Sequence, residues 1–186
     1  MNLTYLAPGE YTRGLLRKGP PMANTLAILL TATTYGTWLR GDARGWVDDG
    51  MVFRPDPVLE GADRLRMKYP VYLLPAGAWR QVGDWIGAAL RQRCQVSIHA
   101  LFVGTWHAHV VVGANRFPPS ALVKCMKDAV RWGLRPRRPI WADGYDKRYC
   151  YEEKSVRARI EYVERHNLAV GRPAKPWPFI EPPRLF

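Results

Sequence analysis

The chain has 186 residues, a length that suits one domain with a substantial core and is short for two. Hydrophobic residues make up 47% of it and aromatic residues 12%, which excludes an intrinsically disordered protein. Because 28 Lys and Arg face 16 Asp and Glu, the net charge of +12 predicts a polyanionic partner, most simply nucleic acid. A basic protein without such a partner is the alternative.

The spacing of the cysteines and the length of the apolar runs indicate where in the cell the protein is expected. Cys94, Cys125 and Cys150 are widely spaced and form no CxxC pair, so neither a zinc ribbon nor a disulfide framework is predicted. The longest apolar run, which begins at Leu26, is too short to span a membrane, and no secretory signal is recognisable. We therefore expect a cytoplasmic protein, nucleoid-associated when bound to DNA, with no membrane contact.

The chain begins with a segment that predicts no element of the fold. Residues 1–21 are rich in Gly and Pro and lack apolar periodicity, so a flexible basic tail is expected. Either Met1 or Met22 would then be the true start of the protein. Residues 27–35 are apolar and β-branched and predict a central strand.

Two loop-like segments follow this strand. Residues 38–49 are polar and punctuated by glycine. They form either an ordinary surface loop anchored by tryptophans, or a nucleic-acid contact loop in which Arg40 and Arg44 bind phosphates and a Trp stacks on a base. Residues 51–74 place three prolines around a charged segment, predict no clear element, and are interpreted as an insertion.

A helix and a strand are predicted next. Residues 74–93 carry apolar side chains at helical spacing, with Pro75 in the first turn. Residues 95–103 alternate enough to predict a strand. His99 lies on that strand and is interpreted as a packed or surface residue rather than a ligand.

The run Trp106-His-Ala-His-Val-Val-Val-Gly113 predicts the second strand of an antiparallel hairpin, joined to the first by Gly104 and Thr105. Side chains alternate along a strand, so His107 and His109 point to the same face. Two imidazoles side by side on a stiff strand form half of a metal site. The pair by itself also leaves a chance coincidence open.

Residues 118–134 predict a second helix, with Ser120 as its cap and an apolar stripe that includes Leu122 and Met126. Cations surround it, and Asp128 is the one acid among them. A solvated basic face is one interpretation, and a phosphate-binding surface is the one we favour. The cations are Arg116, Lys124, Lys127, Arg131, Arg135, Arg137 and Arg138.

The last third predicts a short strand at 147–151, a third helix at 152–167, and a Pro-rich ending that wraps the surface. The order strand, helix, strand, strand, helix, strand predicts an α+β, ferredoxin-like split βαβ fold: a four-stranded antiparallel sheet with helices on one face plus a C-terminal helix. We expect one domain over 22–175 and a tail over 176–186.

The third helix separates into two sides. At 100° per residue, Val156, Ile160 and Val163 share a face that should pack on the sheet. Tyr162 lies away from that stripe, and His166 sits one turn later on the same side, together with Arg159. A Tyr beside a His off the core face suits a reactive site, although a partly exposed pair on an amphipathic helix is the plainer interpretation.

The order of these motifs resembles the single-tyrosine HUH transposases, and most of all the REP-associated tyrosine transposases, whose domain is IS200-like. The likeness runs from about residue 25 to residue 172. It rests on the His107-Ala-His109 triplet, on Tyr35-Gly-Thr-Trp-Leu-Arg-Gly-Asp-Ala-Arg-Gly-Trp-Val47, on Trp141-Ala-Asp-Gly-Tyr-Asp146, and on Ile160-Glu-Tyr-Val-Glu-Arg-His-Asn167. Ala108 stands where the family usually has a bulky apolar residue.

The resemblance implies a chemistry for these residues. His107, His109 and His166 would hold Mg²⁺ or Mn²⁺, and ligand chemistry alone would equally allow Zn²⁺. Tyr162 would attack a phosphate of single-stranded or hairpin DNA, forming a 5′-phosphotyrosine and a free 3′-OH, as in DNA transposition. Other tyrosines of the C-terminal region have no histidine four residues later; these are Tyr145, Tyr149 and Tyr151.

The resemblance also implies DNA contacts, and it allows a homodimer. Trp38 or Trp141 would stack on bases. One rival is a domesticated, non-catalytic ferredoxin-like nucleic-acid-binding protein, and another is a metal-dependent hydrolase. The side chains expected on phosphates are Arg40, Arg44, Arg116, Lys124, Lys127, Arg131, Arg135, Arg137, Arg138 and Arg159.

Overall fold

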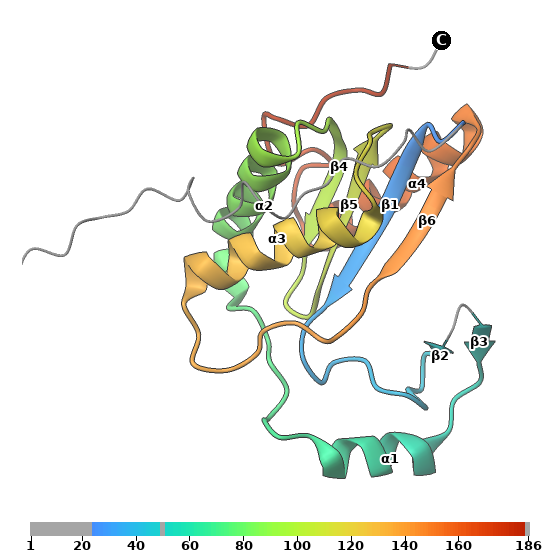
Figure 1. Ribbon diagram of the computed structural model, residues 1–186, viewed down its shortest axis with the longest axis vertical. Helices are drawn as coiled ribbons and strands as arrows, with labels where there is room; N and C mark the ends of the chain where they lie inside the picture. The colour runs from blue at the N-terminus through green and yellow to red at the C-terminus, as the bar shows by residue number, and fades with distance from the viewer. Residues whose placement is uncertain (1–23, 49–50, 185–186) are drawn as a thin grey trace, which may run out of the picture.

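A computed structural model describes residues 24–48 and 51–184, and its centre is a four-stranded antiparallel sheet (Figure 1). The strand order is β4-β5-β1-β6. In chain order, the strands are β1 (Ala27–Thr33), β4 (Ile98–Val103), β5 (His107–Gly113) and β6 (Asp146–Cys150). This order is that of a ferredoxin-like split βαβ fold, so the predicted fold is confirmed. The predicted tail over 1–21 lies outside the described residues.

Helices cover both faces of this sheet. In Figure 1, α2 (Trp79–Arg93) and α3 (Pro119–Leu134) lie in front of it and α4 (Glu153–Ala169) lies behind. Consequently all seven residues of β5 and all six of β4 are buried. None of the helices within the described ranges has the length and apolar character needed to cross a bilayer.

The side chains of β5 divide between two cores. Ala108, Val110 and Val112 join the core formed with α2 and α3, whereas Val111 joins the core beneath α4. Each fully buried side chain of this size contributes about 1.5–3 kcal/mol to folding. Since His107 and His109 share the parity of Val111, both point to the α4 side.

The helices differ in detail from the prediction. A 3₁₀ turn, η1 (Ala76–Ala78), precedes α2, so the regular helix begins later than residue 74. The predicted cap at Ser120 is wrong. The N-cap of α3 is Pro118, which makes no side-chain hydrogen bond, and Ser120 is already the second helical residue. Pro119 at the first helical position presets the backbone torsion and, having no N–H, leaves one amide fewer for a cap to satisfy.

The segment interpreted as lacking an element contains a hairpin strand and a helix. Strand β3 (Met51–Phe53) pairs with β2 (Trp46–Asp48), and α1 (Pro57–Arg66) follows. Asp56 caps α1 by accepting hydrogen bonds from the two backbone amides of Val58 and Leu59. The Asp56-Pro57 pair is the start signal that the prediction missed. In Figure 1 this unit extends from the lower end of the sheet.

The Pro-rich ending is part of the core rather than only a surface wrap. Trp177 is 1% exposed and lies against Gly83 of α2, where a Cβ atom would come within 2.0 Å of its ring. Ile180 forms a parallel bridge with Ile98, and Glu181 donates its backbone N–H to the carbonyl of Ile98. The ending therefore covers the free edge of β4. We propose that the domain extends through these residues.

Candidate active site

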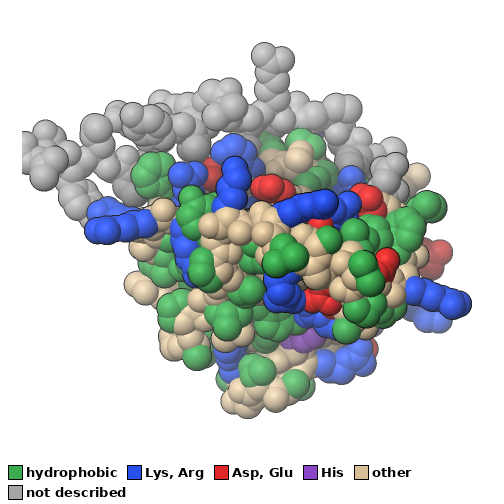
Figure 2. All heavy atoms as spheres, turned by 90° about the horizontal axis from the view of Figure 1, so that it is seen from below, with side chains coloured by type: hydrophobic (Ala, Val, Ile, Leu, Met, Phe, Trp, Pro, Cys, Tyr) green, Lys and Arg blue, Asp and Glu red, His purple; other side chains and the backbone are tan. Residues whose placement is uncertain are grey.

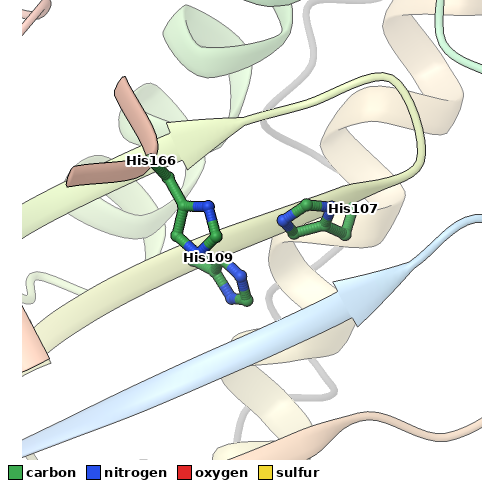
Figure 3. A group of neighbouring side chains, drawn as sticks. All are labelled: His107, His109 and His166. Carbon is green, nitrogen blue, oxygen red and sulfur yellow. The ribbon is translucent and has the colours of Figure 1, made fainter. Parts of the chain in front are cut away.

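Three imidazoles meet on the face of the sheet that α4 covers (Figure 3). His107 and His109 project from β5, and His166 comes from α4. One ring nitrogen of each lies within 4.8 Å of the other two. Such a cluster can hold a metal ion. The fold brings together the three residues that the sequence predicts as ligands.

Two elements position these rings. β5 lies between β1 and β4, so its backbone is hydrogen-bonded on both sides. α4 is held on the sheet by Val156, Ile160 and Val163, each buried as predicted. At its C-terminal end, buried Asn167 donates hydrogen bonds from Nδ2 to the carbonyls of Leu101 and Ala174, at 2.9 and 3.1 Å. This clamp fixes the turn of α4 that carries His166.

The ring nitrogens of the cluster are largely without protein partners. Nδ1 of His109 shares a hydrogen bond of 2.8 Å with the hydroxyl of Thr31 on the neighbouring strand. Neither nitrogen of His107, nor Nε2 of His166, has a partner among the described residues, although all three atoms are buried. Buried polar atoms normally find a partner. These orphaned nitrogens are therefore available to a ligand from outside the chain.

The imidazoles are neutral at physiological pH. Burial lowers the pKa of His107 to about 3, assisted by the nearby charges of His166 and Arg44. Burial likewise lowers the pKa of His109 to about 2, with His107 and His166 as further causes. The pKa of His166 is lowered by burial and by Arg165. Neutral imidazoles keep the lone pairs that bind a metal.

An apolar wall supports the cluster. The ring of Phe102 on β4 lies 5.2, 6.2 and 5.1 Å, centroid to centroid, from His107, His109 and His166. The three clustered donors are all imidazoles, with no carboxylate among them in the part of the chain that the structure describes. This set fits a divalent transition metal such as Zn²⁺, whereas Mg²⁺ prefers oxygen ligands. The expected Mg²⁺ is therefore the poorer match for these donors.

Tyr162 lies against the cluster. Its ring centroid is 5.3 Å from that of His109 and 4.7 Å from that of His166, and both contacts are edge-on. The side chain is partly exposed, so its phenol is within reach of a substrate. Among the described tyrosines, no other ring contacts a histidine of the cluster. Tyr149, for example, packs toward α2 and α3 on the opposite face.

Arg44 borders the cluster through two tryptophans. Its guanidinium lies 4.7 Å from the ring of Trp38 and 4.6 Å from that of Trp106. The ring of Trp106 in turn lies 3.7 Å from that of His107. Hydrogen bonds from Arg44 lower the pKa of the Asp42 carboxyl, so the two form an ion pair. Seen from below, a small histidine surface is visible with several basic side chains near it, among acidic and apolar ones (Figure 2).

The other predicted DNA contacts lie elsewhere. The cations from Arg116 to Arg138 belong to α3 and its flanks, and α3 covers the opposite face of the sheet from the histidines. Lys127 donates to the carbonyls of Ala142 and Gly144, at 2.8 and 2.6 Å, and so serves the loop before β6. The remaining paired cations are Lys124 with Asp128, Arg138 with the carbonyls of Pro70 and Val71, and Arg40 with Asp63.

Arg159 and His99, two further residues considered in the sequence analysis, lie outside the histidine cluster. Arg159 is exposed on α4, one turn before Tyr162. His99 is buried, with Nδ1 hydrogen-bonded to the carbonyl of Glu181, so it is a packed residue as predicted. Two residues of the site were missed. Thr31 contacts His109 only through strand register, which a sequence does not display, but Trp106 directly precedes His107 and was a readable signal.

Comparison with known proteins gives a likeness of overall structure. No protein-family model and no curated protein sequence matches the chain. A solved structure of a REP-associated tyrosine transposase bound to a REP hairpin is similar to it, with 13% sequence identity and a TM-score of 0.49. The alignment covers 90% of this chain and 79% of that chain.

Proposed function

We propose that this protein cleaves and rejoins single-stranded or hairpin DNA through a covalent 5′-phosphotyrosine on Tyr162, as a transposase does. The observation that carries the proposal is the contact of the partly exposed Tyr162 ring with both His109 and His166. Tyr162 also packs against the core beneath α4, although the helical spacing placed it off the core face. A nucleophile and three imidazoles that can bind a metal thus share one partly open site. The net charge of +12 supplies the attraction for a polyanion.

The reaction exchanges one phosphodiester bond for another. The phenol oxygen of Tyr162 attacks phosphorus, the bond to the 3′ oxygen breaks, and the phenol proton ends on that oxygen as a 3′-OH. A bound divalent cation supplies polarisation of the phosphate, which stabilises the developing charge. Because a phenol has a pKa of about 10, its proton must leave as the bond forms. The imidazoles of His107 and His109 are neutral at neutral pH, so one ring nitrogen of each keeps a lone pair that can bind a metal.

The protein would also be able to reverse the step. The phosphotyrosine preserves the energy of the phosphodiester, so a free 3′-OH can attack it and join strands without a nucleotide cofactor. Tyr162 and His166 lie on the same helix, and Asn167 clamps that helix to β4. Tyr162 and His166 therefore keep a fixed separation during cleavage and rejoining. Reacting groups that are held in place react faster than groups that must first diffuse together.

The test is covalent capture. A labelled DNA hairpin with single-stranded arms, incubated with the protein and either Mn²⁺ or Zn²⁺, should yield a protein–DNA adduct that survives denaturation. Tyr162→Phe should abolish the adduct. Tyr151→Phe is the control, because Tyr151 is exposed and directly follows β6, and it should leave the adduct unchanged. An adduct that persists in Tyr162→Phe would overturn the assignment. Cleavage without an adduct would indicate the hydrolase, and DNA binding alone would indicate a non-catalytic binding protein.

A further inference from the structure

The loop between β1 and β2 builds a second feature beside the metal cluster. Trp38 and Arg44 come from this loop, and Trp106 directly precedes β5. The two tryptophan rings lie 6.1 Å apart and are tilted by 58°, and the guanidinium of Arg44 lies over both. Because Trp106 contacts His107, this aromatic and cationic group adjoins the metal cluster directly.

Hydrogen bonds hold these side chains in place without any ligand. Nε and Nη2 of Arg44 each donate to one oxygen of Asp42, both at 2.7 Å, and Nη2 also donates to the carbonyl of Thr37 at 2.6 Å. Asp42 is 7% exposed, so the acceptor is itself fixed by burial. Nε1 of Trp38 donates to the carbonyl of Gly45 at 2.8 Å. Side chains ordered in advance bind with a smaller entropic cost.

Two groups of this arrangement remain available to a ligand. Nη1 of Arg44 has no hydrogen-bond partner among the described residues, and the side chain is 44% exposed. Trp38 is 37% exposed although its indole nitrogen is satisfied. Since Asp42 balances the charge of Arg44, the free N–H offers a directed hydrogen bond rather than general attraction for a polyanion.

The other exposed or polar tryptophans do not compete for this role. Trp141 donates Nε1 to the carbonyl of Lys127 and packs against the core beneath α2 and α3. Trp132 is 69% exposed, but it belongs to α3 and hence to the opposite face of the sheet from the histidines. Trp106, which contacts His107, is only partly exposed, so Trp38 is the more exposed of the two tryptophans beside the cluster.

We propose that Trp38 and Arg44 form a nucleotide-binding subsite next to the metal cluster, in which the Trp38 ring stacks on a base and Nη1 of Arg44 donates to the adjoining phosphate. The inference rests on the proposed function for its substrate class. Both side chains are positioning residues: they set the strand in place beside Tyr162 and take no part in bond exchange. Stacking accepts any base, so this subsite orients the strand without reading its sequence.

Binding without cleavage provides the test. In a Tyr162→Phe background, fluorescence anisotropy measures affinity for a hairpin with an arm of about twelve thymidines, within the usual range for a single-strand site. Trp38→Leu keeps an apolar side chain but cannot stack, and should weaken binding roughly tenfold. Trp132→Leu is the matched control on the opposite face and should leave affinity unchanged. Arg44→Lys should also weaken binding, because it removes the planar fork that Asp42 holds.

A second substrate identifies the stacked base. An arm of abasic units in place of thymidines should weaken binding to the unsubstituted protein as much as Trp38→Leu does, and the two changes together should add no further loss. Equal affinity of Trp38→Leu for the thymidine arm would overturn the subsite, as would a larger loss in Trp132→Leu. Trp38→Phe, which can still stack, should recover most of the affinity and separates stacking from misfolding.

This outcome is independent of the catalytic proposal. If no covalent adduct ever forms but Trp38→Leu still weakens binding, the subsite stands and the tyrosine chemistry fails. If Trp38→Leu binds the strand with the affinity of the unsubstituted protein and forms the adduct at the same rate, the chemistry stands and the subsite fails.

Discussion

The hydroxyl of Thr31 lies 2.8 Å from Nδ1 of His109, across the β1–β5 pairing that places these two residues opposite each other. This bond engages Nδ1 and so leaves Nε2 as the nitrogen of His109 available to a metal. Outer hydrogen bonds of this kind typically change metal affinity by about 10- to 100-fold when they are removed. Thr31 is therefore expected to tune the metal site without binding the metal.

Thr31→Val should lower metal affinity by about tenfold or more while the fold is retained, because the shape is kept and the hydroxyl is lost. Titration against a chromophoric chelator measures the affinity. Thr33→Val is the matched control: Thr33 lies on the same strand opposite His107, whose ring nitrogens have no hydrogen-bond partner in the described chain. Equal affinities of the two variants would show that the Thr31 hydroxyl does not support the site.

The choice of metal follows from the donors. Zn²⁺ or Co²⁺ should raise the melting temperature of the free protein, whereas Mg²⁺ at the same concentration should not, since three imidazoles suit a transition metal. Bound Co²⁺ should give visible absorption bands, which report coordination without any DNA. His166→Ala should weaken binding by at least about tenfold, because one of three ligands is lost. His99→Gln, outside the cluster, should bind normally, and equal stabilisation by Mg²⁺ would contradict the prediction.

Acid should destabilise the metal-free protein. His107 and His109 have pKa values of about 3 and about 2 in the folded chain, both below the ordinary value near 6.5. Below pH 6.5 the unfolded chain takes up protons on these residues and the folded chain does not. The free energy of unfolding should therefore fall as the pH drops from about 6.5 toward 3, by up to about 1.4 kcal/mol per pH unit for each histidine.

Urea denaturation in the presence of a chelator, at several pH values between 7 and 5, measures this slope. The double variant His107→Gln and His109→Gln removes both groups and should show a shallower dependence on pH than the unsubstituted protein. The carboxylates and His99 are common to both proteins, so the difference isolates the pair. Two parallel curves would mean that the pair is protonated in the folded state as readily as in the unfolded state.

The packing of Trp177 against α2 can be tested by adding one methyl group at Gly83. Gly83→Ala would bring a Cβ atom within 2.0 Å of the Trp177 ring, so the C-terminal ending must shift. Overpacking of this kind costs typically about 1–3 kcal/mol of folding free energy. Gly61→Ala in α1 is the control: no atom lies within 4 Å of its added Cβ, and alanine favours the helix by up to about 1 kcal/mol. Denaturant unfolding curves compare the two, and a neutral Gly83→Ala would show that the ending detaches easily.

Local periodicity was enough to predict the main elements. The alternation of β5 placed His107 and His109 on one face, and the spacing of Val156, Ile160 and Val163 identified the buried side of α4. These inferences hold because the repeat of a strand or helix is a property of the backbone, independent of what it packs against. The same rule placed Tyr162 and His166 on one side of their helix.

Segments governed by turns and caps were harder to predict. Helix α1 was missed although Asp56 and Pro57 mark its start, because it is only ten residues long and none of them is buried. The cap of α3 was misplaced for a related reason: Pro118 and Pro119 set the backbone directly, so no capping side chain is needed.

The sequence by itself determined the split βαβ fold, the histidine pair, and the helical spacing between Tyr162 and His166. Only the tertiary structure decided that α4 lies over the histidines while basic α3 lies on the other face. It alone also decided that Thr31 contacts His109 and that the Trp177 ring packs against Gly83 of α2. Local repeats follow from backbone geometry, which each segment carries alone. The choice of facing surfaces follows from many weak contacts between distant segments, which exist only once the chain is folded.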